Sequence, residues 1–72
     1  MEATEELVTR ERMVLILREL YWHRKKLTTA DIARLVGIQW HNAYDTMLLI
    51  ERLAPEVRKD AEGWWVDFAR QW

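Results

Sequence analysis

The side chains that could carry out covalent or metal chemistry are scarce in this chain of 72 residues. It contains no Cys and no Ser, which excludes a disulfide, a thiolate metal site and a Ser or Cys nucleophile. The two histidines, His23 and His41, lack the paired spacing of a metal site, and there is no glycine-rich phosphate loop. We therefore expect no enzyme, no metal and no other cofactor.

Two sets of residues are instead suited to recognition. The cluster His23 to Lys26 is basic, and single positive charges follow at Arg34, Arg58 and Lys59. Lys and Arg side chains contact phosphate groups. The segment Gln39 to Tyr44 combines amide and imidazole groups, which can hydrogen-bond base edges, with two aromatic rings. The fold must place both sets on one side for them to act together.

The charge balance limits how such recognition could work. Lys and Arg number 11 against 12 Asp and Glu, so the net charge is -1, and the isoelectric point is about 6.1. No Arg or Lys occurs from Gln39 to Glu51. This balance argues against nucleic-acid binding through bulk positive charge, so any contact with nucleic acid must be local.

Length and hydropathy predict one small domain over residues 1–72, with residues 1–8 left open as an N-terminal extension and residues 69–72 as a C-terminal tail. The longest apolar run, Met13 to Leu17, is far shorter than the ~20 residues that cross a bilayer. The acidic start, Met1 to Glu6, does not resemble a secretory signal. We expect a cytoplasmic location and no membrane partner.

Capping residues and helical spacing predict the first two helices. The first runs from Arg10 to His23 behind Thr9 as its N-cap, and Leu27–Thr28 forms a short extended piece after it. The capping box Thr28 to Asp31 starts the second helix, Thr29 to Val36. The expected inward residues are Met13, Ile16, Leu17, Leu20 and Tyr21 in the first helix and Ile32, Leu35 and Val36 in the second.

A third helix and a hairpin complete the prediction. Gly37 ends the second helix in the left-handed conformation, and the third runs from Gln39 to Leu53. The strands Glu56 to Lys59 and Trp64 to Phe68 flank a four-residue connection that ends with Gly63 at a positive φ. The expected inward residues are Ala43, Met47, Ile50 and Leu53 in the helix and Trp64, Val66 and Phe68 in the hairpin, with Trp65 exposed.

This order of elements, together with the segment Thr29 to Leu48, resembles the winged helix-turn-helix family. Ala33 is small where two helices cross, and Gly37 makes the turn between them. The residues in the shared core positions are Ile32, Val36 and Ile38. The fold class is therefore expected to be mostly α with a small β-hairpin.

Two strings, Thr9 to Leu15 and Leu27 to Ile38, look most like regulators of the multiple-antibiotic-resistance-regulator type. The resemblance covers about residues 9 to 68. It departs from the family at Ala43 and Thr46, where a larger aliphatic and an inward apolar residue are usual.

The resemblance implies double-stranded DNA binding in transcriptional control, with the third helix in the major groove and the hairpin as a wing. It assigns base contacts to Gln39, Trp40, His41, Asn42 and Tyr44. It assigns backbone contacts to Lys25, Lys26, Thr28, Arg34, Arg58 and Lys59. A nucleoid-associated homodimer with two half-sites is expected, and surplus apolar residues supply its interface: Leu7, Val8, Leu15, Trp22 and Trp72.

The stripe Trp40, Tyr44 and Leu48 has three open interpretations. It could pack against the first helix or the N-terminal residues, bind a partner protein, or stack on nucleic acid. Winged helices also serve as protein–protein modules, which is the alternative function. Cations gathered beside Gln39 and His41 would favour DNA, whereas acids interleaved with them would favour a protein partner.

Overall fold

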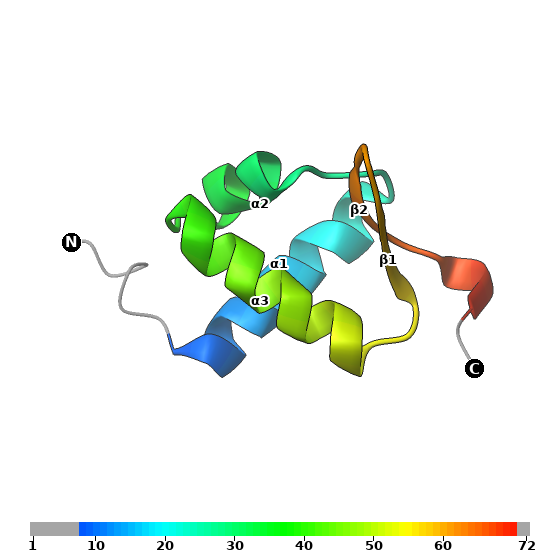
Figure 1. The fold of residues 1–72 in the computed structure, drawn as a ribbon, viewed down its shortest axis with the longest axis horizontal. Coiled ribbons are helices and arrows are strands. Elements are labelled where there is room, and N and C mark those ends of the chain that lie inside the picture. The colour runs from blue at the N-terminus through cyan, green and yellow to red at the C-terminus, as the bar shows by residue number, and fades with distance from the viewer. Residues whose placement is uncertain (1–7, 71–72) are drawn as a thin grey trace.

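Helices come first along the chain and a two-stranded hairpin follows them (Figure 1). The computed structural model describes residues 8–70. The elements are α1 (Thr9–His23), α2 (Thr29–Val36), α3 (Trp40–Leu53), β1 (Val57–Asp60), β2 (Gly63–Val66) and the 3-10 turn η2 (Phe68–Arg70). This is the expected winged helix-turn-helix arrangement of three helices and a wing. No helix in this part of the chain is long and apolar enough to cross a membrane.

The start of α1 differs from the prediction. Val8, not Thr9, is the N-cap, and its backbone N–H donates to the Glu11 carboxylate at 3.2 Å. Thr9 is the first helical residue, and its hydroxyl accepts from the Arg12 guanidinium at 3.2 Å. Further along, Ile16 and Leu20 are fully buried, as predicted.

The local signals of the helix-turn-helix are confirmed. The Thr28 hydroxyl accepts from the Asp31 N–H at 3.0 Å, and the Thr28 N–H donates to the Asp31 carboxylate at 3.1 Å. Gly37 has φ 83° and ends α2. The inward assignment of Leu35 was wrong, because its side chain is 40% exposed. Ala33 is buried instead, since the inward face of α2 is turned toward α3.

Along α3, Gln39 is the N-cap and not the first helical residue. Ala43, Met47 and Ile50 are fully buried, whereas Leu53 is 61% exposed and was wrongly assigned to the core. Its turn is the last of the helix and extends beyond the packed core. Thr46, which stands where the family pattern has an inward apolar residue, is buried. Its hydroxyl donates to the Asn42 backbone carbonyl at 2.7 Å and accepts from Arg12 Nε at 3.1 Å. The polar departure from the family pattern is therefore satisfied by hydrogen bonds.

The hairpin is tighter than predicted. Asp60 pairs with Gly63, so two residues and not four connect the strands. β2 ends at Val66, earlier than predicted, and Phe68 belongs to η2. Leu27 adds a third, one-residue strand: its N–H donates to the Trp64 carbonyl, and the Trp64 N–H donates to the Leu27 carbonyl, both at 2.8 Å. Gly63 has φ 141°, which confirms its predicted positive φ.

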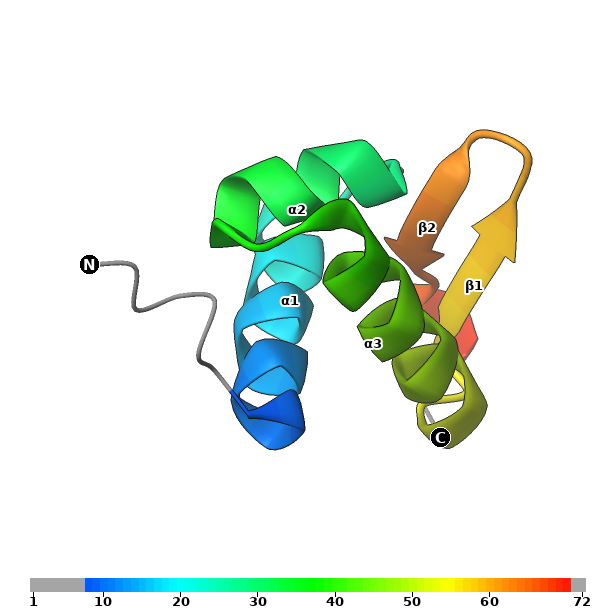
Figure 2. The same ribbon diagram turned by 60° about the vertical axis from the view of Figure 1, so that its left-hand side comes forward.

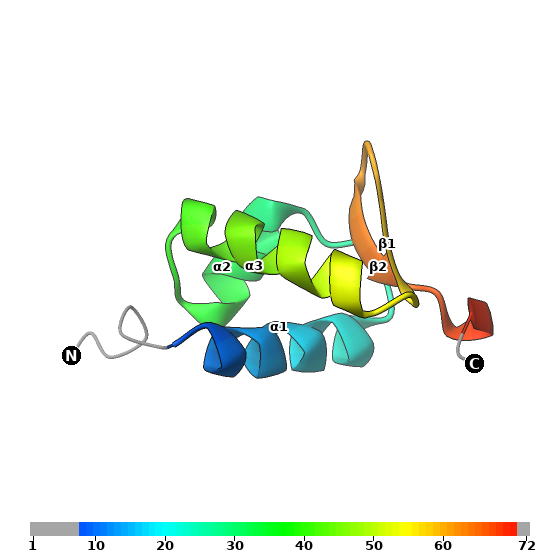
Figure 3. The ribbon, with the colours of Figure 1, turned by 60° about the horizontal axis from the view of Figure 1, so that its bottom comes forward.

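The elements form two layers with the core between them. α1 lies on one side, and α2 and α3 lie on the other (Figure 3). The wing stands beside α3, at the end of the molecule away from the start of α1 (Figure 2). The outward side of α3 is therefore turned away from α1. The outward sides of α1 and α3 are two separate surfaces of the molecule.

Candidate nucleic-acid interface

A hollow of about 310 Å³ opens between the start of α2, the first turns of α3 and the wing. We call its surroundings the α3–wing face. The residues that line it include Thr28, Thr29, Trp40, Tyr44, Lys59 and Trp64, together with the acids Asp60 and Glu62. The helix-turn-helix brings α2 and α3 to this face, and the bridge from Leu27 to Trp64 holds the wing against it.

Aromatic rings line this hollow. Trp40 stacks on Tyr44 with ring centroids 5.1 Å apart and planes 9° from parallel, and Tyr44 meets Trp64 edge-on at 6.4 Å. Trp64 is buried, and its indole N–H donates to the Thr29 hydroxyl at 3.1 Å. Trp40 and Tyr44 are thus connected to the wing through Trp64, whereas the N-terminal residues 1–7, which were the other predicted neighbours of the stripe, lie outside the described residues. Trp40 remains 53% exposed, so its ring can meet a ligand.

The polar positions of α3 are unevenly placed. Gln39 and His41 are exposed, whereas Asn42 is half-buried, and its backbone carbonyl accepts from the Thr46 hydroxyl. Asp45 is exposed one turn after His41 and adds an acid to the outward side of the helix. Among the polar residues predicted to contact bases, the exposed side chains are therefore Gln39 and His41, with the acid Asp45 nearby.

The two predicted wing cations lie on opposite faces of the hairpin. Lys59 pairs across the strands with Trp64, and its ammonium group lies 5.0 Å from the centre of that indole ring, beside α3. Arg58 pairs with Trp65 on the other face, where its guanidinium meets the Asp67 carboxylate at 3.5 Å. Only Lys59 joins the α3–wing face.

Acids neutralise Lys26 at the wing tip. Its ammonium group lies 2.5 Å from an Asp60 oxygen, 3.1 Å from a Glu62 oxygen and 4.7 Å from the centre of the Trp65 ring. The hydrogen bonds to Asp60 and then Glu62 raise the pKa of Lys26 above its ordinary value, and the same contact with Lys26 lowers the pKa of Asp60. Trp65, which was expected to be exposed, is half-buried.

The remaining predicted backbone contacts are also partly occupied. Arg34 lies 2.9 Å from Asp31, and this hydrogen bond, followed by those from Thr28, lowers the pKa of Asp31. The Thr28 hydroxyl already caps α2. Lys25 is exposed and pairs with no acid among residues 8–70. Acids therefore interleave with most of the predicted cations.

The residues predicted for a dimer interface lie on a different surface. Trp22 on α1 is 80% exposed, Val8 is exposed and Leu15 is half-buried. Leu7 and Trp72 lie outside the described residues. The sequence analysis did not identify Val14 as an exposed apolar residue of the same helix, although it is 65% exposed. The signal that could have identified it is its helical position opposite the inward stripe.

Thr29, which holds the Trp64 indole, was also missed. The two residues are 35 positions apart, so no local pattern could pair them. No known protein family, curated protein sequence or solved structure matches the chain. Functional inference therefore depends on the chemistry of the α3–wing face.

Proposed function

We propose that the α3–wing face binds double-stranded DNA, with the first turns of α3 in the major groove. The observation that carries the proposal is the exposure of Gln39, Trp40 and His41 at the start of α3, where Trp40 also lines the hollow beside the wing. A helix with its side chains is about 10–12 Å wide, which fits a major groove about 12 Å wide.

Each part of this face has a role in the proposed complex. Gln39 and His41 donate hydrogen bonds to base edges, and the Trp40 ring packs against apolar groups such as the thymine methyl. Lys59 of the wing and Lys25, just after α1, contact phosphates, which fixes the position of α3 in the groove.

Because most of the predicted cations are paired with acids, we expect electrostatics to contribute weakly to the affinity for DNA. Of the basic side chains assigned to the backbone, only Lys25 and Lys59 lack an acidic partner among residues 8–70. Each neutralised phosphate contributes about -0.9 to the slope of log K against log salt, so one domain should give a slope near about -2. Base contacts must then supply much of the affinity.

The test is a fluorescence-anisotropy titration of labelled duplex with the full chain, from ~20 to ~200 mM salt. We expect salt-dependent binding that His41→Glu weakens at least tenfold. Thr9→Glu brings the same change of charge to the start of α1, away from this face, and leaves the affinity unchanged. Absence of binding at ~20 mM salt, or equal losses in both variants, would refute DNA binding by α3.

A protein partner is the second candidate, and the interleaved ion pairs favour it. Trp40 and Leu48 are exposed without a basic neighbour on α3 before Arg52, and the nearby acids Asp45 and Glu62 are exposed. An apolar surface edged by acids suits a Lys- and Arg-rich amphipathic helix. If such a peptide binds the parent but not Trp40→Ala, while duplex binds neither, this candidate replaces the first.

A further inference from the structure

The outward face of α1 carries a row of side chains that are four residues apart: Arg10, Val14, Arg18 and Trp22. We call this row the α1 stripe. Residues at this spacing are neighbours on one face of a helix. Trp22 is 80% exposed and Val14 is 65% exposed, and both lie opposite the buried inward side of the helix. Cationic and apolar side chains therefore alternate along the α1 stripe, one turn apart.

The cations of the α1 stripe are available to a partner. Arg10 and Arg18 are exposed, and neither pairs with an acid among the described residues. The acids next to them are already engaged, because Glu11 accepts from the backbone N–H of the N-cap at 3.2 Å and Glu19 lies 3.3 Å from His23. The α1 stripe is therefore positively charged, although the whole chain has a net charge of -1.

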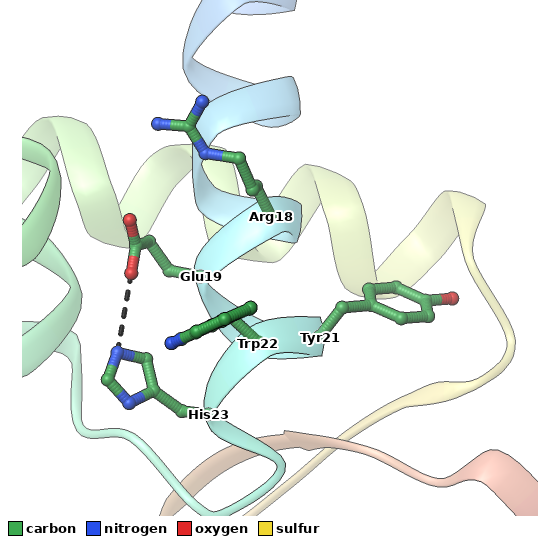
Figure 4. A pocket seen from close by; sticks show the side chains of 5 residues that line it. All are labelled: Arg18, Glu19, Tyr21, Trp22 and His23. Carbon is green, nitrogen blue, oxygen red and sulfur yellow. Dashed lines mark ion pairs between the residues drawn. The ribbon is translucent and has the colours of Figure 1, made fainter.

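Shallow hollows open beside both apolar members of the α1 stripe. One, of about 510 Å³, is lined by the last turns of α1, where Trp22 lies between Tyr21 on one side and the Glu19–His23 pair on the other (Figure 4). The second, of about 440 Å³, is lined by the first turns of the helix, including Val14. Such hollows can receive side chains of a protein that lies along α1.

We infer that the α1 stripe binds an acidic amphipathic helix of a partner protein. The complementary helix carries an acid between two apolar residues at four-residue spacing, so that its apolar side chains pack on Val14 and Trp22 while its acid pairs with Arg18. Rows of residues four apart pack side by side in the commonest class of helix–helix contact. The row from Val14 to Trp22 extends over about 12 Å of helix, which two turns of a partner helix can cover.

Charge favours this occupant over the others. A second copy would bring the same unpaired cations, Arg10 and Arg18, to the same surface, and like charges repel. A bilayer could take up only Val14 and Trp22, because the inward side of α1 is fixed in the core. An acidic helix neutralises the arginines and also covers the apolar side chains between them.

The partner and the proposed duplex would bind on different sides of the molecule. α1 and the outward side of α3 belong to opposite layers (Figure 3). A partner helix on the α1 stripe therefore leaves the α3–wing face open, so a DNA-bound domain could carry the partner with it. The inference itself does not depend on DNA binding.

The test is the fluorescence anisotropy of a labelled peptide titrated with the full chain at ~100 mM salt, where charges more than about 10 Å apart are largely screened. The peptide is an Ala- and Gln-rich helix of ~18 residues with Leu, Glu, Leu and Glu at four-residue intervals on one face. A small interface of this kind should dissociate at ~10–100 µM. Arg18→Glu and Trp22→Ala should each weaken binding at least about fivefold.

Two controls separate this contact from general charge effects. Arg52→Glu makes the same change of charge at the exposed end of α3 and should alter the affinity by less than about twofold. A second peptide, with Lys in place of the Glu that faces Arg18, should bind Arg18→Glu more tightly than it binds the parent. Circular dichroism should show parental helicity in each variant, because the substituted side chains are exposed.

Three results would overturn the inference. The first is a parent that does not bind the acidic peptide at ~500 µM. The second is a loss in Arg18→Glu no larger than that in Arg52→Glu. The third is a parent that ignores the peptide but uses Trp22 to bind phosphatidylserine vesicles or to dimerise in sedimentation, which would assign the α1 stripe to a lipid surface or to a second copy. Duplex binding without peptide binding would leave the proposed function in place, and peptide binding without duplex binding would leave this inference in place.

Discussion

Replacing Gly63 with Ala tests how the wing is held against the helices. A Cβ at this position would lie 2.7 Å from the Leu27 carbonyl oxygen and 2.9 Å from its carbon, closer than real Cβ contacts. The backbone φ of 141° is also one that L-residues rarely adopt. The variant must therefore change the backbone of β2 or separate β2 from Leu27.

Both effects have a cost that follows from the structure. The unusual φ costs about 1–3 kcal/mol. Separation of the strands loses the two 2.8 Å hydrogen bonds between Leu27 and Trp64, each worth roughly 0.5–1.5 kcal/mol. The two costs do not add in full, because separating β2 from Leu27 also lets the backbone at position 63 move to a more favourable φ. We therefore expect a loss of about 2–4 kcal/mol in the free energy of unfolding. For a domain of this size, that lowers Tm by roughly 10–25 °C.

Thermal denaturation followed by circular dichroism measures this loss. Ala61→Ser, in the exposed connection two residues earlier, is the matched control and should change stability by less than about 0.5 kcal/mol. Because Trp64 carries the aromatic side of the α3–wing face, Gly63→Ala should also weaken ligand binding there. A Tm within about 3 °C of the parent would refute the close packing of β2 on Leu27.

Three further outcomes follow. Gly37→Val should lower the free energy of unfolding by more than about 1 kcal/mol, because a β-branched residue disfavours φ 83°; an unchanged melting curve would contradict this. Lys59→Ala should make the salt slope of DNA binding shallower by about one while Arg58→Ala leaves it unchanged, and equal effects would show that the wing binds differently. The lowered pKa of Asp60 stabilises the fold above its ordinary value of 3.8, and this contribution is lost as pH falls through the folded pKa. The raised pKa of Lys26 stabilises below 10.5, and this contribution is lost as pH rises through the folded pKa. Tm should therefore be flat between about pH 5 and 9, and Asp60→Asn should lower that plateau and weaken the fall at acid pH; an unchanged profile would exclude the ion pair.

Short-range rules explain why much of the fold could be predicted. The capping box of Thr28 and Asp31 spans three residues, and Gly37 acts on its own backbone. Helical spacing identified the inward face of α3 through Met47 and Ile50. The same spacing failed at Leu53, because periodicity gives the direction of a side chain and not how far the neighbouring layer extends.

The sequence by itself determined the order of helices and strands, the turn at Gly37 and the absence of a base-reading Arg or Lys from Gln39 to Glu51. These are properties of residues that lie close together along the chain. Only the tertiary structure decided which cations remain available. Lys26 is neutralised by acids 34 and 36 positions away, because the bridge between Leu27 and the wing brings their charges within hydrogen-bonding distance. Electrostatic partners depend on distance in space, and that distance exists only after the chain has folded.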